Sequence, residues 1–150
     1  NSDSFGIKKM IENASDGNLK QKDKSSTFLE GMTEPENLPK WLTDEDLEYF
    51  TNEFKKSGMY GPLNRYRCMD LDWEELFKLS LNKIKQPSCF ITGSLDPVNF
   101  FIPGVNLFES VGENYKNLKV KELIDDVGHW TQQEAPDQVN KILLDFLEKI

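Results

Sequence analysis

The stretch "PSCFITGSLDPV", residues 87–98, is a short apolar run of β-favouring side chains closed by glycine, aspartate and proline. This pattern predicts a buried strand that runs into a loop. Downstream, "PGVNLFESVG" (103–112) suits a helix, and "NLKVKELID" (117–125) alternates imperfectly, as a further strand can. "APDQVNKILLDFLEKI" (135–150) predicts a strong helix. The order strand, helix, strand, helix is typical of the parallel sheet of α/β proteins.

The last of these helices is the best defined in the sequence. Pro136 can occupy its first turn, where the missing N–H donor costs nothing. Its apolar stripe at helical spacing comprises Val139, Ile142, Leu143, Phe146 and Leu147. We interpret it as the closing helix of an α/β core.

Before residue 86 the sequence predicts one long loop and two helices. Residues 13–40 are rich in Ser, Asn, Asp, Gly, Lys and Pro without periodicity, which indicates a surface loop. A plain amphipathic helix then starts behind Thr43, a candidate N-cap followed by three acids, and stops at Gly58. Its apolar stripe consists of Leu47, Phe50 and Phe54.

A turn and a second helix are expected after this first helix. Gly61 and Pro62 favour the turn, and the second helix is expected to run through Leu79. On that helix Tyr66, Met69 and Trp73 can share one face.

Length and charge limit the classes of function. The 150 residues favour one domain, and 29% charged with 37% hydrophobic residues is an ordinary globular composition. The net charge of −8, with basic residues scattered among acids, argues against nucleic-acid binding, because phosphate recognition needs clustered Lys and Arg. No apolar run approaches the roughly 20 residues that cross a bilayer, so no membrane partner is expected.

The two cysteines and the first residues bear on the setting of the chain. Cys68 and Cys89 fit neither a disulfide framework nor a zinc site, which favours structural thiols in a reduced, cytoplasmic environment. The start, "NSDSFGIKKM", has neither the apolar region of a signal peptide nor an initiator Met. We therefore expect the chain to be a piece of something longer.

Candidate chemistry lies where the two predicted strands end. In parallel sheets, functional residues gather on loops at the carboxyl ends of strands. The first strand ends near Asp96 and the second ends near His129, the only histidine of the chain. A carboxylate beside an imidazole fixes its tautomer and stabilises its protonated form, which leaves the other ring nitrogen able to take a proton.

Each residue also has a structural interpretation. An Asp before a Pro is commonly a turn former, and a lone His after a Gly is often structural or merely exposed. The catalytic interpretation gains from their joint position at matching strand ends. On these residues alone both interpretations stay open.

The segment "WLTDEDLEYFTNEFKKSGMYGPLNRYRCMDLDW" (41–73), followed by "GSLDPV" and "DVGHWTQQEAPDQVNKILLDFL", resembles the carboxyl-terminal half of a soluble epoxide hydrolase of the α/β-hydrolase fold. Histidine motifs of this kind are shared by many α/β hydrolases, whereas "GPLNRYR…DW" is distinctive of the helical cap of epoxide hydrolases. The resemblance implies that residues 1–80 are part of that cap, with the loop at 13–40, and that 81–150 are part of the core.

The resemblance also implies roles for three residues. Tyr66 matches the cap tyrosine that donates a hydrogen bond to the epoxide oxygen, Asp96 the charge-relay acid, and His129 the base that activates water. Beside Tyr66, Arg65 stands where an aromatic residue is expected, which puts the pocket wall there in doubt. The structural alternative for Tyr66 is an aromatic in the core of the cap.

The reaction implied is the hydrolysis of an epoxide to a vicinal diol through an alkyl-enzyme ester. A carboxylate opens the ring while tyrosine hydroxyls protonate the emerging alkoxide, and water activated by histidine then cleaves the ester. The partners implied are a small hydrophobic epoxide and water, with no metal or organic cofactor. A homodimer of a full-length protein is one assembly that we consider.

The nucleophile of such a site is missing from the sequence. Neither a G-x-D-x-G elbow nor a His-Gly-x-Pro loop occurs in it, and no residue matches a second cap tyrosine. We therefore expect a fragment that is inactive by itself. The alternatives are a haloalkane or haloacid dehalogenase, an esterase of the same fold, and a binding protein on a degenerate hydrolase fold.

Overall fold

A computed structural model describes residues 36–80, 82–102 and 105–150. Most of the loop expected at 13–40 therefore lies outside the described residues. The helices and strands, in chain order, are α2 (Asp44–Ser57), α3 (Tyr60–Arg67), α4 (Met69–Ser80), β1 (Ser88–Gly93), the 3₁₀ turn η1 (Pro97–Phe100), α5 (Leu107–Ser110), the 3₁₀ turn η2 (Val111–Asn114), β2 (Leu118–Ile124), α6 (Thr131–Glu134) and α7 (Pro136–Leu147).

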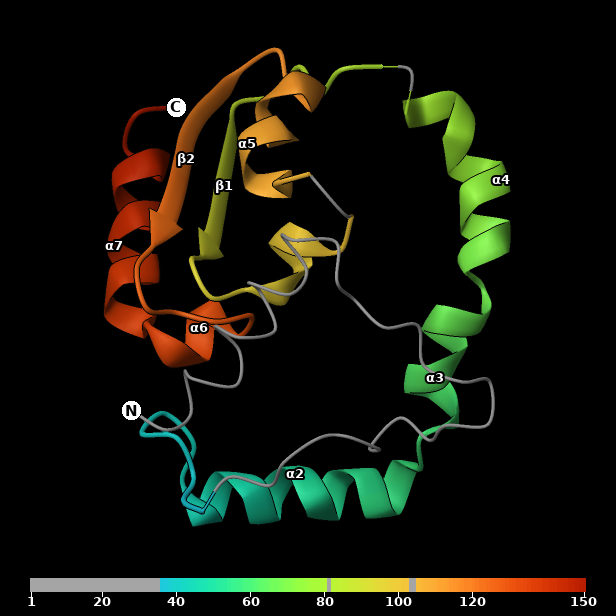
Figure 1. Cartoon of the computed structure of the whole chain (residues 1–150), viewed down its shortest axis with the longest axis vertical. Coiled ribbons are helices and arrows are strands. Elements are labelled where there is room, and N and C mark those ends of the chain that lie inside the picture. Colours follow the sequence, from blue (N-terminus) through green and yellow to red (C-terminus); the bar gives the residue numbers. More distant parts are fainter. Residues whose placement is uncertain (1–35, 81, 103–104) are drawn as a thin grey trace.

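The two strands form a parallel pair (Figure 1). Their register places Cys89 opposite Val120 and ends with Gly93 opposite Ile124. Both strands therefore run out at the same edge, as the β-α-β-α order predicted. The strand predictions are confirmed, and this edge is where the loops carrying Asp96 and His129 begin.

The core of this part of the chain lies between the sheet and α7. Its buried side chains are Ile124, Val127, Ala135 and Val139, with Ile91 and Ile142 packed against them. Burying a valine or isoleucine side chain stabilises the fold by about 1.5–3 kcal/mol. On the opposite face, Phe90 of β1 meets Phe108 of α5, with ring centroids 6.3 Å apart. Successive residues of β1 thus face opposite layers, as the pleat of a strand requires.

Helix α7 confirms the prediction for the last helix. Pro136 occupies its first turn, and Val139 and Phe146 are buried. Leu143 and Leu147, also in the predicted stripe, remain exposed. The stripe is therefore wider than the surface that the described part of the chain buries.

Helix α2 also matches its prediction. The Thr43 hydroxyl oxygen accepts the N–H of Asp46 at 3.1 Å, and the Asp46 carboxylate accepts the N–H of Thr43 at 3.1 Å, which forms a capping box. The Thr43 hydroxyl also donates to the Asp46 carboxylate at 2.6 Å. This bond, and after it the one from the Thr43 N–H, lowers the pKa of the Asp46 carboxyl. Gly58 ends the helix with φ at 68°, a conformation that favours glycine.

The apolar stripe of α2 is exposed to solvent. Leu47, Phe50 and Phe54 are all exposed and line an open apolar hollow together with Met59. Figure 1 shows α2 along the bottom of the view, with α3 and α4 following it up the side opposite the sheet. Among the described residues, nothing in α2 or α3 is buried.

Two expectations about the helices are wrong. Gly61 and Pro62 do not form a turn but lie in the first turn of α3, where a proline needs no hydrogen-bond donor. The second helix is not continuous through Leu79, because α3 ends at Arg67 and Cys68 caps it before α4 begins. Tyr66 therefore belongs to a different helix from Met69 and Trp73.

The helix observed in place of the one expected from Pro103 to Gly112 is much shorter. Pro103 lies outside the described residues, and α5 begins only at Leu107. The cause is Asn106, whose side-chain oxygen accepts the backbone N–H groups of Phe108 and Glu109 and so caps the helix there.

The two thiols differ in their surroundings. Cys68 is exposed and Cys89 is half-buried on β1, and both are free. Burial, with a smaller contribution from the charge of Glu122, raises the pKa of the Cys89 thiol. In the part of the chain that the structure covers, no helix is both long enough and apolar enough to cross a membrane.

Candidate active site

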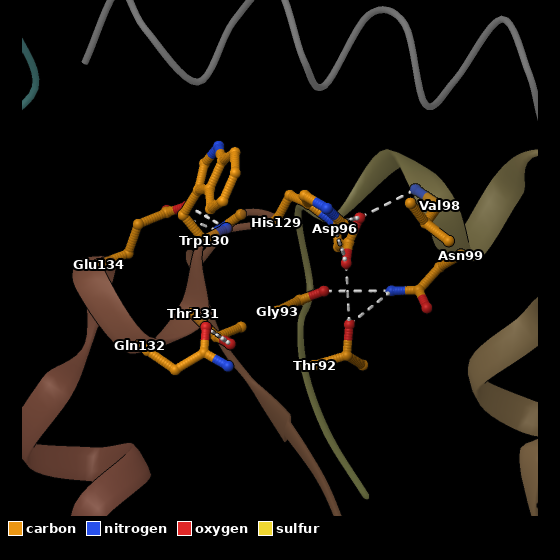
Figure 2. A network of polar contacts seen from close by, with 11 residues as sticks. Thr92, Gly93, Asp96, Val98, Asn99, His129, Trp130, Thr131, Gln132 and Glu134 are labelled. Carbon is orange, nitrogen blue, oxygen red and sulfur yellow. Dashed lines mark hydrogen bonds and ion pairs between the residues drawn. The ribbon is translucent and has the colours of Figure 1, made fainter. Parts of the chain in front are cut away.

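Asp96 lies in the loop directly after β1 and is 7% exposed. It serves as N-cap of η1, with its Oδ1 accepting the backbone N–H of Val98 at 2.9 Å. Its Oδ2 accepts the hydroxyl of Thr92 at 3.3 Å (Figure 2). The turn-forming and the orienting interpretations of Asp96 are therefore compatible, because one carboxylate caps the turn and still faces His129.

A buried polar chain supports this carboxylate. Thr92 and Asn99 are both buried, and the Asn99 amide donates to the carbonyl oxygen of Gly93 at 3.1 Å and to the Thr92 hydroxyl at 3.5 Å. Because the Thr92 oxygen accepts from Asn99, its own proton is left to donate to Asp96. Neither residue was predicted as part of the site from the sequence. Their only signal was a polar side chain on each side of the acid, four residues before it and three after.

His129 faces Asp96 across the sheet edge. Its Nδ1 lies 3.1 Å from both carboxylate oxygens of Asp96. The side chain of His129 is 53% exposed, whereas that of Asp96 is 10% exposed. A carboxylate accepts only, so a neutral His129 in this position carries its proton on Nδ1. Nε2 is then the nitrogen with a lone pair, as a general base requires.

The two loops are held together through the main chain. The N–H of Ser94 donates to the carbonyl of Ile124 at 2.9 Å, and the N–H of Leu95 to that of Val127 at 2.8 Å. The Ser94 hydroxyl also accepts the N–H of Asp126 at 2.9 Å. Asp126 has φ at 56°, a left-handed conformation that Asp tolerates better than most residues. These bonds fix the distance between the Asp96 loop and the His129 loop.

Gly93 is required by this close approach. A Cβ at residue 93 would lie 2.0 Å from the carbonyl oxygen of Val127 and 2.5 Å from that of Gly128. Both atoms belong to the main chain, so a side chain at residue 93 would push the His129 loop away from β1. The glycine that closes the predicted strand is thus also the residue that lets the two loops meet.

We expect Gly93→Ala to lower the free energy of unfolding by about 1–3 kcal/mol, because the added methyl forces the backbone to shift. Urea unfolding followed by circular dichroism measures the effect. Gly112→Ala is the matched control, since a Cβ there would meet its nearest atom, on Leu118, at an ordinary 3.8 Å. Equal stability of the two variants would contradict this account of the loop contact.

Tyr66 is not brought to this pair. It lies on α3 with 71% of its surface exposed, and within the described residues no hydrogen bond joins it to Asp96 or His129. The neighbouring Arg65 is exposed as well. The role expected for Tyr66 therefore stays a prediction. In the same part of the chain, no three His, Cys, Asp or Glu side chains gather in a way that could hold a metal ion.

Several known proteins are similar to this chain, and those described below are epoxide hydrolases. No protein-family model matches the chain. Epoxide hydrolase B of Mycobacterium tuberculosis is 41% identical over 113 residues, which are 75% of this chain and 31% of that protein. Epoxide hydrolase 1 of Siraitia grosvenorii is 38% identical, over 79% of this chain and 38% of the relative.

Solved structures agree with the sequence relatives. Epoxide hydrolase A from Mycobacterium thermoresistibile superimposes with a TM-score of 0.68 at 42% identity, over 77% of this chain and 35% of that one. An epoxide hydrolase from Vigna radiata gives a TM-score of 0.68 at 33% identity, over 75% of this chain and 37% of that one. The chain thus spans about a third of the length of the proteins that it matches.

Proposed function

We propose that this chain, a relative of the α/β-hydrolase-fold epoxide hydrolases that spans about a third of their length, supplies the acid–histidine pair of an epoxide hydrolase site. The observation that carries the proposal is the pairing of His129 Nδ1 with both oxygens of the buried Asp96, at 3.1 Å. The substrate class is a small hydrophobic epoxide, with water as the second reactant.

In this proposal His129 acts in the second half of the reaction. Opening of the epoxide leaves a hydroxyalkyl ester on a carboxylate nucleophile. Nε2 of His129 takes a proton from water, and the resulting hydroxide attacks the ester carbonyl and releases the diol. Asp96 stabilises the imidazolium that forms, and its bonds from Val98 and Thr92 keep the carboxylate in place while the charge develops.

Tyr66 enters the proposal as the acid that hydrogen-bonds to the epoxide oxygen during ring opening. Its support is the resemblance of the segment 41–73 to the cap of epoxide hydrolases. An exposed phenol on α3 is available to a pocket completed by other parts of an enzyme. Tyr66→Phe should slow the formation of the ester without slowing its hydrolysis, which separates this role from a packing role.

The nucleophile is proposed to come from outside these 150 residues, because the sequence holds no G-x-D-x-G elbow. In this arrangement residues 1–80 contribute to the cap and residues 81–150 to the core. The two free thiols suit a reduced, cytoplasmic setting.

A hybrid enzyme tests the proposed function. The hybrid is Mycobacterium tuberculosis epoxide hydrolase B with its 113 matched residues replaced by those of this chain. We expect the hybrid to convert styrene oxide to its diol, whereas the 150-residue chain alone releases no diol above a His129→Ala control. A folded hybrid that neither binds styrene oxide covalently nor hydrolyses it would contradict the proposal, and so would diol formation by the chain alone.

A further inference from the structure

The carboxylate of Glu134 is bonded to the main chain on both sides of His129. Its Oε2 accepts the N–H of Gly128 at 2.7 Å. Its Oε1 accepts the N–H of Trp130 at 3.0 Å (Figure 2). Hydrogen bonds to an ionised acceptor are stronger than those between neutral groups. One half-buried side chain therefore holds the residue before and the residue after the candidate base.

The local fold returns Glu134 to this place. Helix α6 is a single turn that starts directly after Trp130, and the N–H groups of Gln133 and Glu134 both donate to the Trp130 carbonyl, at 2.9 and 2.8 Å. This turn brings the Glu134 side chain back over the His129 loop. Hydrogen bonds from Gly128 and Trp130 to α6 therefore tie the loop to this helix, and His129 lies between the two tied residues.

Gly128 is matched to this carboxylate. A Cβ at residue 128 would lie 2.8 Å from Glu134 Oε1 and 3.1 Å from Oε2. Only a residue without a side chain lets the carboxylate approach the Gly128 N–H to 2.7 Å without either group moving. Gly128 and Glu134 therefore depend on each other, because the bond between them needs both the carboxylate and a residue without a side chain.

We infer that Glu134 is a positioning residue for His129. It fixes the main chain at Gly128 and Trp130, so that the imidazole is presented to Asp96 with Nδ1 inward, and it does not itself touch the reacting atoms. Asp96 holds the ring and Glu134 holds the backbone that carries the ring. The inference rests on the proposed function for its catalytic meaning, but the geometry that it predicts is measurable without turnover.

The single histidine makes a direct test possible. In the ¹⁵N-labelled 150-residue chain, the two imidazole nitrogens of His129 are the only histidine ring signals, and their shifts report which nitrogen carries the proton in the neutral form. The wild-type chain should show the proton on Nδ1. Glu134→Ala removes both acceptors, so the main chain no longer holds the imidazole against Asp96. The bond from Nδ1–H to the Asp96 carboxylate should then be lost. We expect the ratio of the Nδ1–H to the Nε2–H tautomer to fall by about tenfold, the effect of losing one hydrogen bond to a charged group.

Two further variants sharpen the test. Glu134→Gln keeps one acceptor oxygen and should give a ratio between those of the wild type and Glu134→Ala. Glu148→Ala removes an equal charge at the far end of α7 and should leave the ratio unchanged. Amide signals of Phe90 and Val120 in the two strands report whether the sheet persists in each variant.

Three outcomes would overturn the inference. In the first, Glu134→Ala keeps the wild-type tautomer ratio while the sheet amides are unmoved. In the second, both Glu134 variants lose the sheet, which would make Glu134 a residue for the fold as a whole. In the third, the wild-type ratio equals that of free imidazole. None of these readings depends on epoxide turnover, so a failure here is distinct from a failure of the proposed function.

Discussion

His129→Gln in the hybrid enzyme is expected to lower the rate of diol formation by about 10²–10⁴-fold, the range that a positioned general base contributes. Glutamine can still hydrogen-bond to Asp96 but cannot take a proton from water. Ring opening does not require this base, so the ester should form at close to its normal rate. Steady-state assay of the diol, with rapid-quench measurement of the ester, separates the two steps.

The control for this substitution lies next to it. Trp130 is as exposed as His129 and its ring meets the imidazole edge-on, with centroids 5.5 Å apart. Trp130→Phe keeps an aromatic ring and should change the rate of diol formation far less than His129→Gln. If the two variants lost activity equally, the histidine would be acting through packing and not as a base.

Asp96→Asn is expected to lower kcat of the hybrid on the order of 10⁴-fold, the loss seen when the acid of such a triad becomes an amide. The asparagine oxygen would stay with the N–H of Val98, because that bond caps η1. Its NH₂ group would then face His129, which must accept at Nδ1 and carry its proton on Nε2. The ring would be present but in the tautomer that cannot take a proton from water.

Asp137→Asn is the matched control for this change of charge. Asp137 is an exposed acid in the first turn of α7, one residue beyond the proline that follows the His129 loop. Its replacement should leave kcat within a few fold, as expected for an exposed helix-end charge. A fall in kcat at Asp96→Asn no larger than that at Asp137→Asn would show that the Asp96 carboxylate does not orient the base.

The sequence predicted the parts of this fold that follow from periodicity and from strand ends. The apolar run at 87–98 predicts a buried strand, and the stripe beginning at Val139 predicts an amphipathic helix; the structure has β1 and α7 there. Both strands of a parallel pair end at the same edge, so Asp96 and His129 could be placed near each other without coordinates. The structure adds that Nδ1 is the nitrogen that faces the acid.

Other features could not be predicted, either because a residue type fits two local structures or because its role depends on contacts that form only in the folded chain. Gly61 and Pro62 are typical turn residues, yet Pro is equally compatible with the first turn of α3. Glu134 resembles any glutamate in a short helix until α6 turns its side chain back on the loop. Thr92 and Asn99 become informative only once the Asp96 carboxylate is known to point between them.

The helices that precede the sheet show a limit of another kind. The apolar residues of α2 follow the predicted periodicity, yet Phe50 is exposed in the described part of the chain, as are Tyr66 of α3 and Trp73 of α4. Periodicity identifies the face of a helix that is to be buried, and it carries no information about what covers that face. The role of Tyr66 therefore rests on resemblance, whereas the pairing of Asp96 with His129 rests on geometry.

The intact mass of the His129→Gln hybrid after mixing with styrene oxide tests the central claim most directly. If His129 is the base that hydrolyses an alkyl-enzyme ester, the protein should gain the mass of one styrene oxide and keep it while diol release is slow. The unaltered hybrid should release diol and show little of this adduct. A His129→Gln hybrid that forms diol at the unaltered rate, with no adduct at any time, would contradict the account.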